Sequence, residues 1–199
     1  MSIEKRKYEL KERARRQDET RQRIAAATAE LHAEVGPART TVAEIARRAG
    51  VQRLTVYKNF PDDYALFAAC QRHFLTASPP PDPSAALALA DPAERLETVL
   101  RDLYGWYRRN ERTSTNVRRD RELLPALDAL MRDTGDAATA RLADTLAAGF
   151  GRRKAVRAAV ALALDFWTWR RLAREGLTDR SAAALMTNAV RAAAQSVSG

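Results

Sequence analysis

The spacing of apolar residues along this chain is helical almost throughout. Apolar side chains recur three or four positions apart, as at Leu96, Val99, Leu100 and Leu103, and this spacing places them on one face of an α-helix. Alternation at every second position is absent, and the β-branched residues that favour strands are sparse. The pattern therefore predicts an all-α fold.

Turn-forming and capping residues divide this pattern into separate helices. The strongest break is the segment SPPPDPS at 78–84, because consecutive prolines hold the backbone extended. We expect an 18–77 domain before this break and an 85–199 domain after it. The helices that we expect cover 18–35, two short segments either side of Gly50, a segment that starts at Pro61, a segment that starts at Asp91, 114–121, 124–149, 153–175 and 179–196.

The first 17 residues form a polar, basic extension. Glutamates and arginines four positions apart, such as Glu9 and Arg13, favour a solvated helix. This extension either continues the next helix or forms a frayed arm. A basic arm can reach a minor groove or flanking phosphates, although three glutamates dilute its charge, so an inert solvated tail is the alternative. The residues that would act are Lys5, Arg6, Lys7, Arg13, Arg15 and Arg16.

The segment TVAEIARRAGVQRLTVYKNF, residues 41–60, predicts two short helices joined by a turn at Gly50. Thr41 and Glu44 have the spacing of a capping box that opens the first helix. A helix-turn-helix fits this pattern, and so does any other corner of two helices with a solvated face. Apolar residues would hold the pair together, leaving five polar residues outward: Gln52, Arg53, Thr55, Tyr57 and Lys58.

These outward residue types suit DNA. Arginine can donate two hydrogen bonds to guanine, glutamine can pair with adenine, and threonine can contact a thymine methyl group. Tyrosine and lysine can hold phosphates, which fixes the register of the protein on the duplex without reading sequence. The formal net charge of +9 also favours an anionic partner such as nucleic acid.

Composition argues against several other classes of protein. The one cysteine, Cys70, cannot form an internal disulfide, which suits a reducing cytoplasm. The longest apolar run, 155–169, is interrupted by Arg157 and Asp165 and is shorter than the roughly 20 residues of a membrane span. No zinc-binding, phosphate-binding or nucleophile-elbow motif occurs. We therefore expect a cytoplasmic protein without a catalytic site, metal or cofactor.

Residues 20–75 resemble the DNA-binding domain of the TetR family of bacterial transcriptional regulators. The matching string is TTVAEIARRAGVQRLTVYKNFPDDYALF. The resemblance implies a homodimer that places two recognition helices on a palindromic operator in double-stranded DNA. It also assigns Thr41, with Tyr57 and Lys58, to phosphates. Two residues depart from the family pattern: Leu54 replaces a small residue, and Asp63 replaces a phosphate-binding lysine.

The segment LYGWYRRNERTSTNVRRDRELLPALDAL, residues 103–130, is similar to the ligand-binding domains of a subset of the same family. The resemblance implies a cavity for a small-molecule effector. Aromatic residues at helical spacing more often form a plain core, and neighbouring arginine and aspartate residues more often form an ion pair. The candidate cavity residues are Trp106, Tyr107, Asn116, Arg119, Asp120 and Leu123.

The last two predicted helices are rich in alanine, which lets helices approach closely. In the family, two final helices pair with those of a second subunit as a four-helix bundle. The residues that this resemblance places at the dimer interface are Val156, Ala159, Val160, Ala163, Trp167, Leu185, Ala189 and Ala192.

Three functions remain open from the sequence. The first is a ligand-responsive, sequence-specific regulator, most often a repressor. The second is a small-molecule-binding helical module whose DNA-binding head is weak or non-specific, and the third is an architectural DNA binder that acts through charge. Sequence preference would separate the first from the other two.

Overall fold

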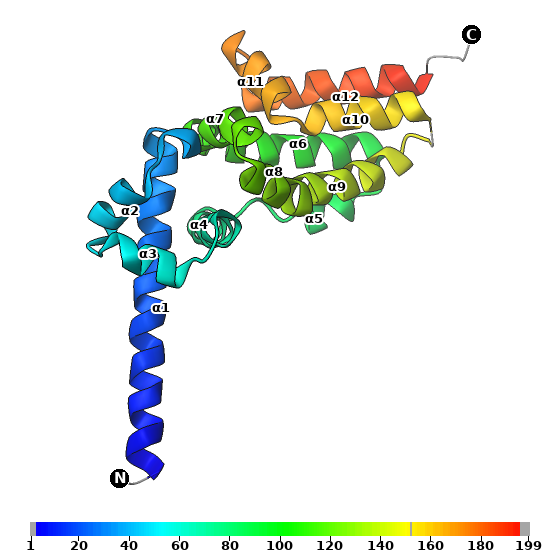
Figure 1. Cartoon of the computed structure of the whole chain (residues 1–199). Helices are drawn as coiled ribbons and strands as arrows, with labels where there is room; N and C mark the ends of the chain where they lie inside the picture. Colours follow the sequence, from blue (N-terminus) through cyan, green and yellow to red (C-terminus); the bar gives the residue numbers. More distant parts are fainter. Residues whose placement is uncertain (1–2, 152, 196–199) are drawn as a thin grey trace. The chain divides into compact units, whose positions relative to one another are not determined.

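The computed structural model describes residues 3–151 and 153–195, and all of the regular secondary structure in these ranges is helical (Figure 1). The predicted all-α fold is confirmed. The chain divides into two compact units. The first comprises the residues up to Pro79 together with Arg112–Leu130, and the second comprises Pro80–Glu111 together with the residues from Met131 onward.

The helices of the first unit are α1, α2, α3, α4, α7 and α8. Helix α1 spans Ile3–Glu34, so the polar extension and the first apolar helix are one continuous helix rather than a helix and a frayed arm. The other bounds are Val42–Ala49 for α2, Arg53–Asn59 for α3, Asp63–Ala77 for α4, Glu111–Asp120 for α7 and Pro125–Met131 for α8. The first residue of α7 and the last residue of α8 belong to the second unit.

The core of the first unit is formed where α1, α2 and α3 meet. Its buried apolar residues are Ile24, Ala27, Leu31, Ile45, Ala46, Ala49, Val56, Phe60 and Leu66. Those on α1 lie three or four positions apart, which is the spacing that gives an amphipathic helix one buried face. Helix α4 also lies against α1. This core holds α3 in place while leaving its other face exposed.

The second unit contains α5, α6, α9, α10, α11 and α12. Their bounds are Ser84–Leu87, Pro92–Arg109, Ala137–Ala148, Lys154–Leu164, Phe166–Arg174 and Asp179–Gln195. Helix α12 lies along α6 and α10, and α10 lies along α9 (Figure 1). Large aromatic residues fill the centre, where Tyr104, Phe166 and Trp169 are fully buried.

Two predicted helices differ from the observed ones, and one observed helix was not predicted. The expected helix 153–175 is two helices, because Asp165 leaves the helical conformation and its carboxylate accepts a hydrogen bond from Thr168 N–H at 2.9 Å, which caps α11. The expected helix 124–149 contains a π-helical turn at Arg132–Asp136. The short helix α5 follows the proline-rich segment and was not expected.

The unit boundaries also differ from the expected domains. Residues 112–130, which we expected in the second domain, pack with the first unit. The physical reason is a set of hydrogen bonds from α7 to the end of α1, described below. Among the described residues, no helix is both long enough and apolar enough to cross a membrane.

Candidate nucleic-acid interface and effector cavity

The turn between α2 and α3 is built around Gly50. This residue has a φ of 65° in the left-handed region, where glycine carries no steric penalty. The Val51 N–H donates to the Ala46 carbonyl at 2.9 Å, which satisfies a carbonyl that the helix end would leave without a partner. The chain therefore reverses sharply and begins α3 three residues later.

The start of α2 is capped at Thr41, as the sequence predicts. Its hydroxyl accepts a hydrogen bond from the Glu44 N–H at 3.2 Å. The reciprocal half of the expected capping box is replaced, because the Glu44 carboxylate instead accepts two hydrogen bonds from Arg47, at 2.9 and 2.6 Å. Those hydrogen bonds lower the pKa of Glu44 and keep its carboxylate ionised.

The outward face of α3 brings the predicted DNA-binding residues together. Gln52, Arg53, Tyr57 and Lys58 are exposed, Thr55 is half-buried, and Thr41 is exposed at the start of α2. Tyr57 is 58% exposed and Leu54 59% exposed, although large apolar surfaces usually lie inside a protein. Val56, on the other face, is buried in the core of the unit.

The charges on α2 and α3 are arranged differently. On α2, Arg48 donates to both carboxylate oxygens of Glu34, at 2.7 and 2.8 Å, and Arg47 pairs with Glu44. On α3, Arg53 and Lys58 form no ion pair with any described residue, and the helix contains no acidic residue. The positive charge of α3 is therefore available to an anionic partner.

Arg21, which the sequence analysis did not single out, holds α3 against α1. Its guanidinium donates to the Asn59 carbonyl at the end of α3 and lies 4.4 Å from the centroid of the Phe60 ring. A cation at the carboxyl end of a helix is favourable because the helix dipole is negative there. No local sequence signal identifies this role, since Arg21 and Asn59 are 38 positions apart.

Helix α7 caps the carboxyl-terminal end of α1. The Asn116 side-chain amide donates to the His32 and Ala33 carbonyls, at 3.2 and 3.0 Å, and Arg112 donates to the Glu34 carbonyl at 3.0 Å. The last carbonyls of a helix have no partner within it. Helix α7 therefore provides a carboxyl-terminal cap for α1 from a distant part of the chain.

A buried carboxylate completes this cap. Asp120 accepts a hydrogen bond from the Ala38 N–H at 3.0 Å and is paired with Arg119 at 2.6 Å. Burial raises the pKa of Asp120, but the hydrogen bonds from Arg119 and Ala38 outweigh burial, so its pKa lies below the ordinary value. The carboxylate is ionised and fixes the turn that follows α1.

Comparison with known proteins agrees with this geometry. Residues 24–70 match the family model described as bacterial regulatory proteins, tetR family. The matched segment is therefore a DNA-binding domain of the TetR type. The match spans the last part of α1, the α2–α3 pair and the first half of α4, which are the elements that form the exposed basic face. The chain therefore contains a helix-turn-helix domain of the kind found in bacterial regulatory proteins of the tetR family.

Two solved structures share the fold of this chain. A TetR-like transcriptional regulator from Rhodococcus sp. RHA1 is 17% identical, with a TM-score of 0.59 over 86% of this chain and 93% of that one. A Clostridium perfringens protein described as a candidate fatty acid metabolism regulator is 18% identical, with a TM-score of 0.59 over 86% of this chain and 97% of that one. No curated protein matches the chain by sequence.

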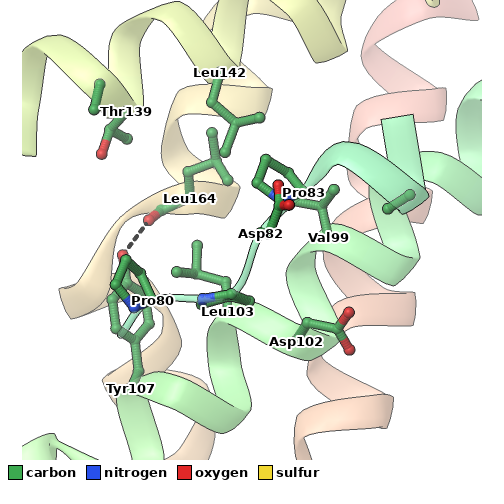
Figure 2. Close-up of a pocket in the computed structure, with 13 residues that line it drawn as sticks. Pro80, Asp82, Pro83, Val99, Asp102, Leu103, Tyr107, Thr139, Leu142 and Leu164 are labelled. Atoms are coloured by element: carbon green, nitrogen blue, oxygen red, sulfur yellow. Dashed lines mark hydrogen bonds between the residues drawn. The ribbon is translucent and has the colours of Figure 1, made fainter. Parts of the chain in front are cut away.

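The second unit of the chain contains a cavity of about 260 Å³. Its walls come from α6, α9, the end of α10 and the proline-rich segment 80–83 (Figure 2). Of the candidate cavity residues, only Tyr107 lines it. The Tyr107 hydroxyl donates to the Leu164 carbonyl at 2.8 Å, and Trp106 packs at the edge of the core with its ring 5.8 Å from that of Tyr107.

The other four candidates do not line this cavity. Asn116, Arg119 and Asp120 hold the end of α1, as described above, and Leu123 is 69% exposed in the first unit. The resemblance placed one residue, Tyr107, at this cavity. It did not show that α7 turns its polar side chains towards α1.

The candidate dimer residues fall into two groups. Val156, Val160 and Ala163 are 0% exposed; they belong to the core of the second unit, which corrects their predicted place at an interface. Ala159 is half-buried and packs against that core. Trp167, Leu185, Ala189 and Ala192 are exposed.

A buried pair of titratable groups links α1 to α4. The Cys70 Sγ lies 3.4 Å from the His32 Nδ1. Burial raises the pKa of the Cys70 thiol to about 12 and lowers the pKa of His32 to about 4. Both groups are therefore neutral near pH 7 and contribute to packing. Within the described ranges no group of three histidine, cysteine or acidic residues has the geometry of a metal site.

Proposed function

We propose that this protein is a ligand-responsive repressor of the TetR family that binds a palindromic operator as a homodimer. The observation that carries the proposal is the exposed face of α3, where Arg53 and Lys58 have no ion-pair partner among the described residues. Unpaired arginine and lysine beside exposed Gln52 and Tyr57 form the mixture of base-reading and phosphate-holding groups that a major groove accepts.

In this proposal, α3 enters the major groove with its first turn towards the bases. Gln52 and Arg53 read base edges, and Thr41, Tyr57 and Lys58 hold phosphates. The exposed Leu54 side chain is suited to the methyl group of a thymine. Arg21 supports this arrangement from behind, because it fixes the far end of α3 to α1.

Dimerisation would follow from the exposed apolar residues of the second unit. Among the described residues of that unit, the large apolar side chains that remain exposed are those of Leu162, Trp167 and Leu185, on α10, α11 and α12. On α12, Leu185, Ala189 and Ala192 recur at helical spacing on the exposed side. An apolar surface of this kind is typical of interfaces between subunits.

The effector would act through the helix that forms a wall of the cavity. Val99, Leu103 and Tyr107 of α6 line the cavity, and only Asn110 separates α6 from α7. A shift of α6 is therefore passed along the chain to the hydrogen bonds that α7 makes with the end of α1. To release the operator, the effector must bind one conformation more tightly than the other, since equal affinity for both would shift nothing.

The decisive experiment is selection of binding sites from random duplex DNA at about physiological salt. We expect an enriched palindrome whose half-sites are about 34–36 Å apart, which is one turn of DNA. Arg53→Ala should relax the base preference at one position of each half-site, whereas Lys58→Ala should weaken binding to all sequences alike. Arg174→Ala, an exposed change on α11, is the matched control and should leave the selected sites unchanged.

The competing function is a ligand-binding helical module with a non-specific DNA-binding head. Binding without enrichment of any sequence would contradict the proposed operator recognition and favour this alternative. Its affinity for DNA would then depend on salt but not on sequence.

A further inference from the structure

Apolar and charged residues are unequally represented in the lining of the cavity of the second unit. Most of its lining is apolar, and Figure 2 shows Val99, Leu103, Leu142 and Leu164 around it with prolines of the 80–83 segment. Cavities of this kind favour a ligand with an apolar body because burial of apolar surface is favourable. The Tyr107 hydroxyl is already bonded to the Leu164 carbonyl.

The charged groups that line the cavity are all acidic. Asp82 and Asp102 are among the lining residues, whereas lysine, arginine and histidine are absent from the lining. Figure 2 shows Asp82 on the 80–83 segment and Asp102 on α6, with the Asp102 carboxylate directed away from Thr139 and Leu142 of α9. A ligand in the cavity therefore meets negative charge on one side and apolar surface elsewhere.

Asp82 is held in the ionised form with one oxygen available. Both of its hydrogen bonds, from the Ser84 N–H at 3.0 Å and the Ser84 hydroxyl at 2.6 Å, go to Oδ1. These hydrogen bonds lower the pKa of Asp82. Within the part of the chain that the structure describes, no donor bonds to Oδ2.

The Asp102 carboxylate is held by weaker interactions than the Asp82 carboxylate. Its Oδ1 lies 3.4 Å from the Arg101 Nε, and both side chains are about half exposed, at 48% and 52%. Exposed ion pairs of this kind are worth little, because water and salt screen them. A cation at the cavity can therefore approach Asp102 without breaking a strong interaction.

We propose that the cavity binds a small hydrophobic cation, such as an alkylamine or a quaternary ammonium compound. The apolar body lies against α6, α9 and α10, and the positive charge lies between Asp82 and Asp102. A carboxylate of similar size would be repelled by the two aspartates, and no lysine, arginine or histidine of the lining would neutralise it. This inference rests on the proposed function, because it names the class of effector for the same cavity.

The test compares three molecules that share one alkyl chain: octylamine, octan-1-ol and octanoate. Their binding to the full-length protein is measured by isothermal titration calorimetry at pH 7, where the amine is protonated and the acid ionised. We expect octylamine to bind at least tenfold more tightly than octanol, and octanoate more weakly than octanol. Octanoate binding as tightly as octylamine would overturn the inference.

Substitutions test whether the preference for octylamine depends on Asp82 and Asp102. Asp82→Asn and Asp102→Asn, combined, should remove the preference for octylamine over octanol, while octanol binding persists and shows that the cavity is intact. Asp144→Asn, which removes the same charge elsewhere in the second unit, should leave the preference unchanged. Ala138→Phe, which fills the cavity, should weaken octylamine and octanol alike. A preference that survives the double variant would contradict the assignment.

The outcome separates the two proposals. If octylamine binds as expected but no operator is selected from random DNA, the effector class stands and the regulatory function fails. If an operator is selected but none of the three molecules binds, or the amine has no preference over octanol, the regulatory function stands and the effector class is wrong.

Discussion

Gly36 joins α1 to the rest of the first unit under two constraints. Its φ is 94°, in the left-handed region, and a Cβ added to it would lie 2.4 Å from the Asp120 Oδ2. We expect Gly36→Ala to lower the free energy of unfolding by about 1–3 kcal/mol, measured by urea denaturation. Gly135→Ala is the control, since nothing lies within 4 Å of its added Cβ. Equal destabilisation by both changes would contradict this reasoning.

His32 makes the stability of the first unit depend on pH. Burial lowers its pKa from 6.5 to about 4, with Asp120 opposing the shift. Because the folded pKa is depressed, the stabilising effect is complete above pH 6.5 and is lost as pH falls towards 4. We expect the wild type to lose up to about 3 kcal/mol more than His32→Gln between pH 7 and pH 4.

Denaturation of the two proteins at both pH values gives the difference directly. Carboxylates that titrate in the same range contribute equally to both and cancel. Parallel losses in the wild type and His32→Gln would show that the buried imidazole, which lies beside the Cys70 thiol, is not the titrating group.

At the scale of elements, the amino-terminal half of α1 is largely exposed to solvent. Its described side chains from Lys7 to Glu19 are almost all exposed, and Arg15 pairs with Glu12 at 3.1 Å and with Glu19 at 3.2 Å. At 1.5 Å per residue, residues 3–20 extend for about 25 Å. An isolated helix of this length is marginally stable in water. Because its side chains are exposed and several are basic, we expect it to contact the phosphates of flanking DNA.

We expect deletion of residues 1–16 to flatten the salt dependence of operator binding, because fewer counterions would be released from DNA. Fluorescence anisotropy with a labelled operator at several salt concentrations measures the slope. A second variant, with Lys7, Lys11 and Arg13 changed to glutamine, keeps the length of the helix and should flatten the slope in part. An unchanged slope in both variants would indicate an inert extension.

Local signals predicted the elements that depend on near neighbours. Gly50, the cap at Thr41 and the helix start at Asp91 each depend on residues two to five positions away, and each is observed. The break at Asp165 was missed because aspartate within a run of apolar residues has no distinctive spacing. Helix α10 is apolar on most sides, so periodicity could not identify its buried face, and Val156 and Val160 were placed outside the core.

The cavity and the cap on α1 were harder to predict, because both depend on contacts between distant residues. Asn116 and His32 are 84 positions apart, and the sequence near either residue is the same whether they meet or not. Resemblance to a family indicated that residues 103–130 matter, but it did not separate Tyr107, which lines the cavity, from its neighbours on α7.

At the scale of the whole molecule, the exposed apolar residues of α10 and α12 predict its oligomeric state. Leu162→Glu combined with Leu185→Glu should convert a dimer at micromolar concentration into monomers, because a charge on each side of a buried interface is costly. Sedimentation velocity measures this change, and operator affinity should fall with it. Leu123→Glu, at a residue 69% exposed in the first unit, is the control. Dimers that persist in the double variant would place the interface elsewhere.

The division of the chain into interleaved units has a consequence for how such proteins can be recombined. The first unit takes residues 112–130 from the middle of the sequence that forms the second. A hybrid made by one crossover near Pro79 would join this protein's α1 to another protein's α7. Unless the donor also had an amide at the place of Asn116, the His32 and Ala33 carbonyls would lose their partners. A DNA-binding head is therefore inherited intact only when α7 accompanies it.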